Sequence, residues 1–164
     1  MLGFESLQII LAFIFGTAIG SFLNVLIWRL PQEKSAGGRS YCPHCKHQLK
    51  WHDLIPVLSF VFARGRCKYC SKPVSLRYPL IEVVTGFLFA LSLFLFPVTD
   101  LVSAVWGVRA AVIVAICVVV FVIDLEHYLI LDRVVYPGMA IILALTIAYD
   151  LSAGLPLSFF FVSH

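Results

Sequence analysis

Long stretches without a charged residue dominate the pattern of hydrophobic and polar positions along this chain. The first covers residues 6–28 and is 23 residues long. As an α-helix with a rise of ~1.5 Å per residue it measures roughly 35 Å, which exceeds the about 30 Å thickness of a bilayer's hydrocarbon core. Further uncharged stretches lie at 83–99, 110–123 and 134–149. The pattern predicts an all-α, polytopic membrane protein with about four transmembrane helices, the third of which extends over 101–123 if Arg109 snorkels.

A cleavable signal peptide also places an apolar stretch near the N-terminus. However, no basic residue precedes this stretch, it is too long for the apolar region of a signal peptide, and no small-residue cleavage site follows it. We therefore interpret it as a transmembrane helix. Near the other end, the apolar residues 151–163 are interrupted by Gly154 and Pro156, and we expect them to be too few to cross the bilayer.

Composition and charge support a membrane protein and orient it. Of the 164 residues, 61% are hydrophobic and 13% are charged, which excludes a soluble globular domain, a disordered tail and a coiled coil. Ten of the twelve Lys and Arg residues lie within 29–78, with only two acids, Glu33 and Asp53. Because basic loops are retained in the cytoplasm, we expect this loop inside the cell and the N-terminus outside. Anionic lipid headgroups account for the basic surplus, so we expect membrane lipids, and not nucleic acid, as partners.

The basic loop contains two Cys-x-x-Cys pairs. They are Cys42-Pro-His-Cys45 and Cys67-Lys-Tyr-Cys70, separated by 21 residues. Two such knuckles can supply the four thiolates of a tetrahedral structural zinc site. Thiols stay reduced in the cytoplasm, which disfavours disulfides; redox-active dithiols and unliganded cysteines are the alternatives to zinc.

Other residues near these motifs are expected to have ordinary roles. Four cysteines complete a zinc site, so we interpret His44 and His47 as solvated loop histidines. Cys117 lies in the middle of the third apolar stretch and is expected to pack as a small hydrophobic residue.

Three acids lie at or near membrane depth, where ionisable groups are costly and often functional. They are Glu82, Asp124 and Asp132. An aspartyl hydrolase needs two carboxylates close enough to share a proton. Asp124 and Asp132 are eight residues apart, which is about 12 Å on one continuous helix, although a turn between them shortens the distance. The alternative is a pair of interfacial acids that bracket a short cytoplasmic turn.

Small and polar residues lie on one face of the first apolar stretch. Gly16 and Gly20 form a Gly-x-x-x-Gly contact face, and Ser21 and Asn24 add polar groups one turn later. Helix packing explains all four.

Taken together, these residues resemble the type IV prepilin peptidase family, the bifunctional leader peptidase/N-methyltransferases of bacterial inner membranes. The similar segments are Gly20-Ser-Phe-Leu-Asn-Val-Leu-Ile-Trp-Arg-Leu-Pro31, Cys42-Pro-x-Cys45, Asp53-Leu-Ile-Pro-Val-Leu-Ser59, Arg64-Gly-Arg-Cys-Lys-Tyr-Cys70 and Arg77-Tyr-Pro-Leu-Ile-Glu82. Asp124 in Ile-Asp-Leu-Glu-His-Tyr-Leu-Ile-Leu-Asp132 is similar to the family's first catalytic aspartate, with Leu131 where proline is usual.

The resemblance implies cleavage of short basic leaders from prepilins or pseudopilins at the cytoplasmic face of the inner membrane. It also implies methylation of the new N-terminus from S-adenosylmethionine where the methyltransferase activity is present. Asp124 is then catalytic, Asp132 is the weaker candidate for the second acid, and the zinc of Cys42, Cys45, Cys67 and Cys70 is structural. The acidic, proline-containing stretch that is usual before the first knuckle is absent from 37–41, which bears on the methyltransferase activity.

The same resemblance suggests a division of the chain. The expected segments are transmembrane helix 1–28, zinc-binding loop 29–78, transmembrane helix 79–99 and a partial aspartic peptidase domain 101–164, with the family's N-terminal domain at about 12–95. The family's second catalytic aspartate lies in a Gly-x-Gly-Asp segment that does not occur before His164. We therefore expect these 164 residues to cleave prepilin poorly or not at all by themselves.

Three functions remain at this stage. The first is the peptidase, and the second is a noncatalytic zinc-bearing membrane module that binds pilin precursors or a partner subunit. The third is a membrane dithiol redox protein, which the zinc-like spacing of the cysteines disfavours. The oligomeric state is left open.

Overall fold

The computed structural model describes residues 2–128 and 132–152. The helices in chain order are α1 (Leu2–Arg29), η1 (Leu30–Gln32), η2 (Trp51–Leu54), α2 (Leu58–Phe62), α3 (Arg77–Leu95), α4 (Leu101–His127) and α5 (Asp132–Ser152). The described residues contain no strand, only two isolated bridges, Tyr41 with Gln48 and Arg66 with Pro73. The prediction of an all-α fold is confirmed.

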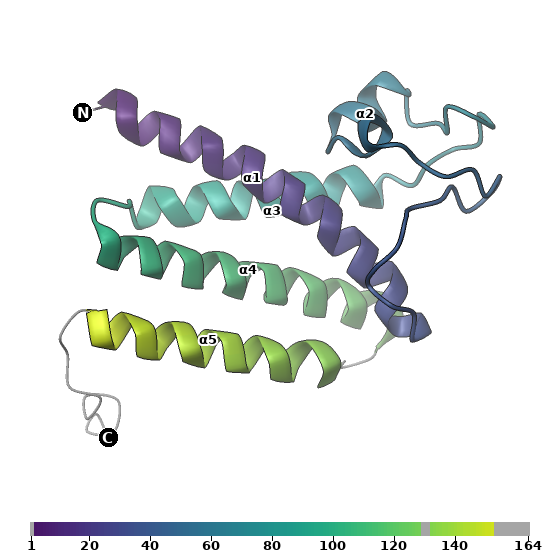
Figure 1. Ribbon diagram of the computed structural model, residues 1–164. Helices are drawn as coiled ribbons and strands as arrows, with labels where there is room; N and C mark the ends of the chain where they lie inside the picture. The colour runs from purple at the N-terminus through teal and green to yellow at the C-terminus, as the bar shows by residue number, and fades with distance from the viewer. Residues whose placement is uncertain (1, 129–131, 153–164) are drawn as a thin grey trace.

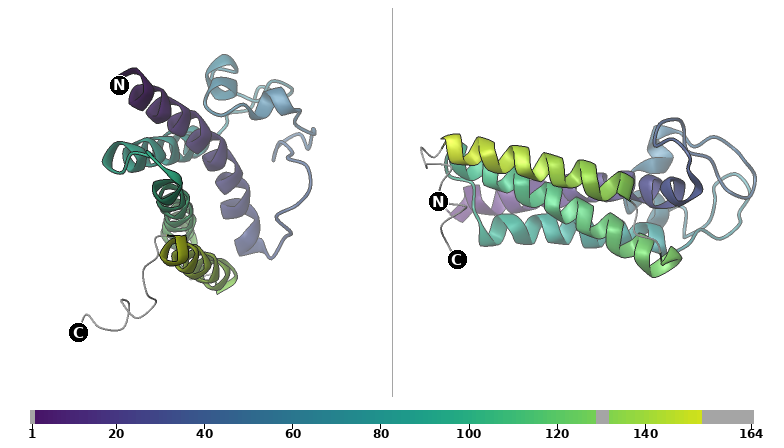
Figure 2. Two further views of the ribbon diagram at one scale, coloured as in Figure 1. Left: turned by 60° about the vertical axis from the view of Figure 1, so that its left-hand side comes forward. Right: turned by 90° about the horizontal axis from the view of Figure 1, so that it is seen from below.

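The four long helices run up and down beside one another, and the segment between α1 and α3 projects from one end (Figure 1). The ends of α1 and α4 and the starts of α3 and α5 lie at this end, which we call the loop end. Two further views show the same arrangement, with α4 between α3 and α5 (Figure 2).

Three of the helices are long and apolar enough to cross a membrane. They are residues Glu5–Gln32, Arg77–Leu95 and Ser103–His127, while the apolar part of α5, Val134–Asp150, is shorter. Since α5 has 21 residues and lies along α4, the fourth predicted helix is present. The chain is therefore a multi-pass membrane protein.

The second long helix ends before the last residue of the expected segment. The expected segment was 79–99, but α3 ends at Leu95, and Phe96 is extended with φ −132° and ψ 76°. Pro97 follows, and proline has no N–H to continue the helix. The chain turns there, and Asp100 then caps α4 by accepting a hydrogen bond from the Ser103 N–H at 2.7 Å.

The α1–α3 contact depends on glycines, as expected from the Gly-x-x-x-Gly pattern. A methyl group added at Gly16 would lie 2.8 Å from Gly86 Cα, and one at Gly20 would lie 2.8 Å from Glu82 Cα. A methyl group added at Gly86 would lie 2.9 Å from the Phe13 carbonyl oxygen. The absence of side chains at these positions lets the two helix backbones approach closely, which provides the packing between helices that are surrounded by lipid.

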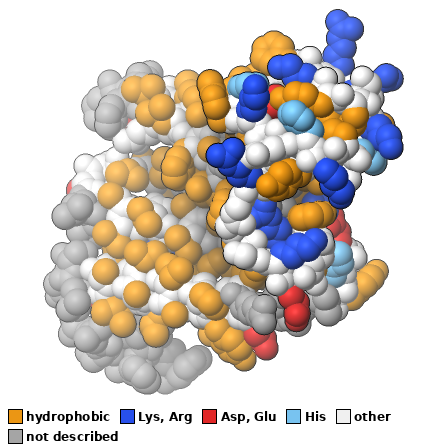
Figure 3. All heavy atoms as spheres, turned by 45° about the vertical axis from the view of Figure 1, so that its right-hand side comes forward, with side chains coloured by type: hydrophobic (Ala, Val, Ile, Leu, Met, Phe, Trp, Pro, Cys, Tyr) orange, Lys and Arg blue, Asp and Glu red, His pale blue; other side chains and the backbone are white. Residues whose placement is uncertain are grey.

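The buried hydrophobic core lies in the loop-end half of the bundle. It consists of Leu23, Ile27, Ile81, Val118, Val119 and Ile123. Many other large apolar side chains of the long helices are exposed, including Ile10, Phe15, Phe87 and Phe121. Figure 3 shows the contrast between this apolar helix surface and the Lys and Arg side chains gathered on the projecting segment. An exposed apolar surface of this kind suits contact with lipid tails.

The helix α4 is continuous from Leu101, so the longer of the two predicted versions of this helix is right. The Arg109 guanidinium lies 4.0 Å from the Trp106 ring centroid and donates a hydrogen bond to Thr146 Oγ1 at 3.3 Å. The positive charge is thus placed on an aromatic face between α4 and α5. Leu131 and residues 153–163, which entered the sequence interpretation, lie outside the described residues.

Candidate functional site

Each Cys-x-x-Cys pair forms a tight turn with the same backbone pattern. In the first, the Cys42 N–H donates to the His47 carbonyl at 3.0 Å and the Lys46 N–H donates to the Cys42 carbonyl at 2.9 Å. In the second, the Cys67 N–H donates to the Lys72 carbonyl and the Ser71 N–H to the Cys67 carbonyl, both at 2.8 Å. The spacing of the cysteines within one turn directs both thiols of a pair to the same side.

The four thiols meet although 21 residues separate the two pairs. All four sulfur atoms lie within 4.8 Å of one another, and Cys42 Sγ is 3.9 Å from Cys70 Sγ. In a tetrahedral zinc site with Zn–S bonds of about 2.3 Å, neighbouring sulfurs are ~3.8 Å apart. Cys42 and Cys67 are buried, Cys70 is half-buried and Cys45 is exposed. The geometry is thus suited to a metal ion.

The pKa values of two of these thiols move in opposite directions. Burial raises the pKa of Cys42, but hydrogen bonds from the Cys45 and His44 backbone and from neighbouring thiols outweigh it and lower the pKa to about 7. A backbone hydrogen bond at Lys72 lowers the pKa of Cys70, but burial and the other thiols raise it to about 11. Adjacent thiolates repel one another, and a bound cation removes that repulsion. The donor set therefore fits Zn²⁺.

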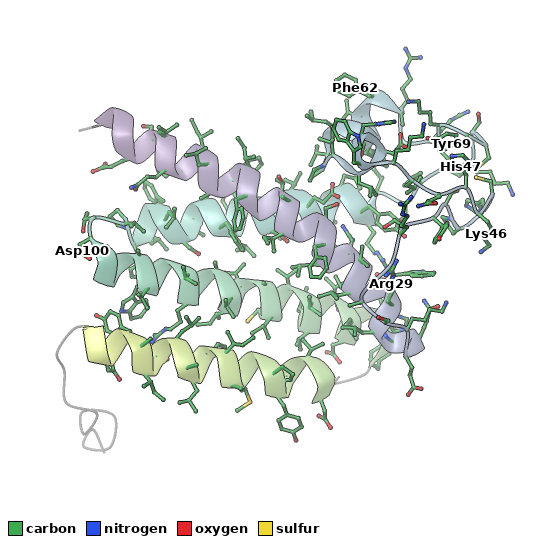
Figure 4. All side chains as sticks on the ribbon, in the orientation of Figure 1. Arg29, Lys46, His47, Phe62, Tyr69 and Asp100 are labelled. Atoms are coloured by element: carbon green, nitrogen blue, oxygen red, sulfur yellow. The ribbon has the colours of Figure 1, made fainter. Side chains whose placement is uncertain are left out.

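The two expected solvated histidines, His44 and His47, are exposed and do not belong to the thiol cluster. The His47 ring stacks on Tyr69 of the second pair with 3.7 Å between ring centroids. Figure 4 shows these two side chains together at the far side of the projecting segment. His47 is therefore more than a solvated side chain, because it joins the two cysteine turns.

Tyr69 also connects the cysteine turns to residues 53–59, which we call the arm. Its hydroxyl donates to Asp53 Oδ2 at 2.8 Å. Burial raises the pKa of Asp53, but hydrogen bonds from the Lys50 N–H and Tyr69, together with nearby positive charge at His52 and Lys68, outweigh it and lower the pKa. The same hydrogen bond raises the pKa of Tyr69. The carboxylate is thus ionised at neutral pH and fixes the start of the arm.

Arg29 holds the start of the projecting segment. Its guanidinium donates to the backbone carbonyls of Ala36 at 3.0 Å, Arg39 at 3.0 Å and Gly37. The side chain is buried, and Figure 4 places it where α1 meets the segment. A single cation at the end of a membrane helix therefore organises residues that contain no regular secondary structure.

Glu82 connects the arm to α3. It is 8% exposed, and its Oε2 accepts a hydrogen bond from the Val57 N–H at 2.7 Å. Val57 has φ 60° and ψ −50°, a rare conformation for a β-branched residue, and the Leu58 N–H donates to the Pro56 carbonyl at 2.5 Å. These values define a γ-turn. The buried carboxylate therefore stabilises a strained turn of the arm.

The arm, the cysteine turns and the loop ends of α1 and α3 enclose a cavity of about 1540 Å³. Asn24, Glu82, Asp53, Tyr69 and Cys42 are among the residues that line it. The cavity therefore extends from the thiol cluster to polar groups within the helix pair.

The two predicted carboxylates lie at the loop end but in different helices. Asp124 is in the last turn of α4 and Asp132 is the first residue of α5, and both are exposed. Helix α4 ends at His127, and its C-cap Tyr128 has a left-handed backbone conformation with φ 52°, so the two acids are not on one continuous helix. Among the described residues, no hydrogen bond joins the two carboxylates, nor does either form an ion pair. A pairing of Asp124 with Asp132 stays a prediction.

Several site residues were not found by sequence reasoning. Arg77 of α3 forms an ion pair with Glu126 of α4 at 2.5 Å, which links the cavity helices to the turn that carries Asp124. Asn24 was explained by packing alone, and Arg29 only by its charge. Arg77 and Glu126 are 49 residues apart, and no sequence pattern indicated this pair or the contacts of Arg29.

The fold and site together define a class of protein. It is a multi-pass α-helical membrane protein with a four-cysteine cluster that could hold a metal ion, in a basic segment between its first two membrane helices. Comparison with known proteins narrows this class. Residues 14–96 match the family described as "Bacterial Peptidase A24 N-terminal domain".

Similar curated proteins have names that agree with this match. A prepilin leader peptidase/N-methyltransferase of Myxococcus xanthus is 40% identical over 152 residues, which cover 92% of this chain and 44% of that protein. A type 4 prepilin-like proteins leader peptide-processing enzyme of Escherichia coli is 36% identical over 137 residues, with 72% and 49% covered. A prepilin leader peptidase/N-methyltransferase of Klebsiella pneumoniae is 36% identical over 134 residues, with 77% and 57% covered. No solved structure matches.

The chain belongs to the prepilin leader peptidase family. It spans about half the length of the curated relatives that it matches. The resemblance inferred from the sequence motifs is thereby confirmed.

Proposed function

We propose that this chain forms the N-terminal, zinc-bearing half of a membrane-embedded aspartic endopeptidase that removes leader peptides from prepilins or pseudopilins. The observation that carries the proposal is the family relationship, with relatives named as prepilin leader peptidases over most of this chain. The position of Asp124 at the loop end, together with the basic segment, supports a site at the cytoplasmic face of the inner membrane.

In this proposal Asp124 is one carboxylate of the catalytic pair. One carboxylate deprotonates a water that attacks the scissile carbonyl, and the other protonates the carbonyl oxygen. Asp132 is the weaker candidate for the second acid, since Arg133 follows it in sequence and a neighbouring positive charge favours the ionised form. The remaining candidate is an acid in a segment of the relatives that this chain does not span.

Cys42, Cys45, Cys67 and Cys70 would hold a structural zinc ion. Their role would be to fix the two turns and, through Tyr69 and Asp53, the arm above the cavity. The name N-methyltransferase in relatives implies S-adenosylmethionine as a methyl donor, and we extend that activity to this chain only as part of the same proposal.

The test is a cleavage assay in proteoliposomes. The 164-residue chain is combined with the C-terminal half of the Myxococcus xanthus relative and given a prepilin with a short basic leader. We expect cleavage by the combination and little or none by the chain alone. Asp124→Asn should lower the rate by at least about 100-fold, because positioned acid–base groups contribute that much or more. Asp150→Asn, at the other end of the bundle, is the matched control and should not change the rate.

Each other outcome has a definite meaning. Full activity of the chain alone, lost in Asp132→Asn, would identify Asp132 as the second acid. Cleavage that survives Asp124→Asn would refute the assignment of Asp124. If prepilin binds but is not cleaved, either by the chain alone or by the combination of the two halves, the noncatalytic module would be favoured.

A further inference from the structure

The inner end of the cavity contains a hydrogen-bond acceptor without a donor. Asn24 of α1 is 4% exposed and lines the cavity. Its Nδ2 donates to the Tyr78 carbonyl of α3 at 3.0 Å. A carbonyl can only accept, so this contact fixes which way the amide points. Within the described residues, Asn24 Oδ1 is buried and has no partner.

Glu82 also lines this part of the cavity, and its carboxyl group has no cation partner among the described residues. Within residues 2–128 and 132–152, no basic nitrogen is paired with its carboxylate. The nearest candidates by sequence are engaged elsewhere, since Arg29 donates to loop carbonyls and Arg77 pairs with Glu126. The carboxylate is contacted by the Val57 N–H on Oε2 and by the Ser21 side chain, neither of which carries a positive charge.

Asn24 and Glu82 are about one helical turn apart on facing helices. Gly20 of α1 is against Glu82 Cα, and Asn24, one turn later, is against Tyr78, one turn earlier on α3. One turn corresponds to about 5.4 Å. Ser21 lines the same part of the cavity. This end of the cavity therefore presents the amide oxygen of Asn24 and the carboxyl group of Glu82 as hydrogen-bond acceptors.

We infer that Asn24 and Glu82 form a binding site for a protonated primary amine, and that the amine is the free α-amino group of a peptide. An ammonium has three donors and no acceptor, so it can satisfy Asn24 Oδ1 and the Glu82 carboxylate together. A buried acceptor that lacks a donor is costly, and a cavity of about 1540 Å³ has room for several residues of a peptide. The inference rests on the proposed function for the choice of a peptide as ligand.

The test is peptide binding to the zinc-loaded 164-residue protein in phosphatidylcholine nanodiscs, with empty nanodiscs as the blank. The probe is an octapeptide with an apolar N-terminal half and a C-terminal fluorescent label, either with a free α-amine or N-acetylated. We expect the free amine to bind about 10-fold or more tightly than the acetylated peptide, as for hydrogen bonds to charged groups.

Three variants separate recognition from folding. Asn24→Leu keeps the side-chain size and should reduce the ratio of the two affinities to about one. Glu82→Gln retains an acceptor for the Val57 N–H but lacks the charge, and should reduce the ratio with no loss of zinc. Gln8→Leu is the matched control, because it removes a similar α1 amide–carbonyl bond, from Gln8 to Val98 at 3.0 Å, at the other end of the bundle. It should leave the ratio unchanged.

An equal affinity for both peptides, or no binding of either, would overturn the inference, as would an equal effect of Gln8→Leu and Asn24→Leu. If replacing phosphatidylcholine by phosphatidylethanolamine abolished the preference, the amine bound would be that of the lipid headgroup and the peptide assignment would be wrong. The cleavage assay with Asp124→Asn is independent of these measurements, so a failure of the amine site and a failure of the proposed peptidase function are distinguishable.

Discussion

Asp53 shows how a single side chain can position the arm. Its carboxylate accepts hydrogen bonds from the Lys50 N–H at 3.1 Å and from the Tyr69 hydroxyl at 2.8 Å. The pKa of Asp53 is lowered, so this stabilisation is present above the pKa of a free aspartic acid and is lost as the pH falls through the lowered pKa. The raised pKa of Tyr69 has the opposite consequence: its stabilisation is complete below the pKa of a free tyrosine and is lost as the pH rises through the raised value.

Replacement of the carboxylate should therefore change the titration of Tyr69. We predict that Asp53→Asn lowers the pKa of Tyr69 towards that of a free tyrosine, because the charged acceptor that favours the protonated hydroxyl is removed. The measurement is an alkaline NMR titration of ring-labelled tyrosine, with Tyr69→Phe to assign the signal. Glu33→Gln changes the other acid of the basic segment and should leave the titration unchanged. An unaltered Tyr69 pKa in Asp53→Asn would show that the hydrogen bond does not form.

The residues of the site differ in how well the sequence reveals them. The four cysteines were predictable because the spacing within each pair determines which ligands one turn can supply. Asn24 was not, since a polar residue in a membrane helix has the same sequence signature whether its acceptors are satisfied or not. Asn24 is distinguished only by the Tyr78 carbonyl, 54 residues away, which leaves its oxygen unpaired. Glu82 was identified as a candidate because it is an acid near membrane depth. Its hydrogen bond from the Val57 N–H was not predictable, because that bond requires the strained turn of the arm.

At the scale of elements, the long helices and the cysteine turns are stabilised in different ways. The α1–α3 pair is held by close glycine contacts and by the hydrogen bond from Asn24 Nδ2 to the Tyr78 carbonyl at 3.0 Å. The cysteine turns contain no core of their own beyond the buried thiols Cys42 and Cys67. In small segments of this kind a bound metal commonly supplies the folding free energy.

We predict that removal of zinc unfolds the cysteine turns and leaves the helices intact. Purified protein should contain about one zinc per chain, and chelation should expose the four loop thiols to alkylation with little change in helical circular dichroism. Cys45→Ser should reduce the zinc content to near zero, because three ligands remain. Cys117→Ser, which alters the exposed cysteine of α4, is the matched control and should retain the metal. Full alkylation of the four loop thiols before chelation would contradict a structural zinc site.

The elements were largely predictable because long uncharged stretches allow few structures other than membrane helices. The ends of these helices were less predictable. The second helix was extended to 99 because 96–99 is uncharged, yet Pro97 and the Asp100 cap end one helix and begin the next. The residues of the basic segment gave no periodic pattern, because the turn at Val57 is bonded to Glu82 of α3 and Arg29 contacts irregular backbone.

At the scale of the whole molecule, the charge distribution separates the two ends of the bundle. The loop end has the basic segment, the ion pair between Arg77 and Glu126, and both predicted carboxylates. The opposite end has the Phe96–Pro97 turn, where Phe96 and Trp106 rings stack at 6.0 Å and Trp106 meets Tyr149 at 5.8 Å. Aromatic rings of this kind favour the interface between lipid and water. One end of the molecule therefore contains the charged groups, and the other end contains clustered aromatic side chains.

This asymmetry gives a direct test of orientation. Because ten basic residues are concentrated in 29–78, we predict that the loop end faces the cytoplasm and that the turn between α3 and α4 faces outward. In a background without Cys117, Ser35→Cys and His127→Cys should react with a membrane-impermeant thiol reagent only after the cells are opened, while Thr99→Cys should react in intact cells. The four thiols of the basic segment are present in every variant, so the protein with only the Cys117 substitution gives the background. Labelling of residue 35 or residue 127 from outside would place the four cysteines and Asp124 away from the cytoplasm, and a leader peptidase acting at the cytoplasmic face would then be excluded. If the loop end is labelled only in opened cells and the turn between α3 and α4 in intact cells, then Asp124, the cavity and the proposed amine site face the cytoplasm. That is the compartment in which the proposed cleavage of leader peptides takes place.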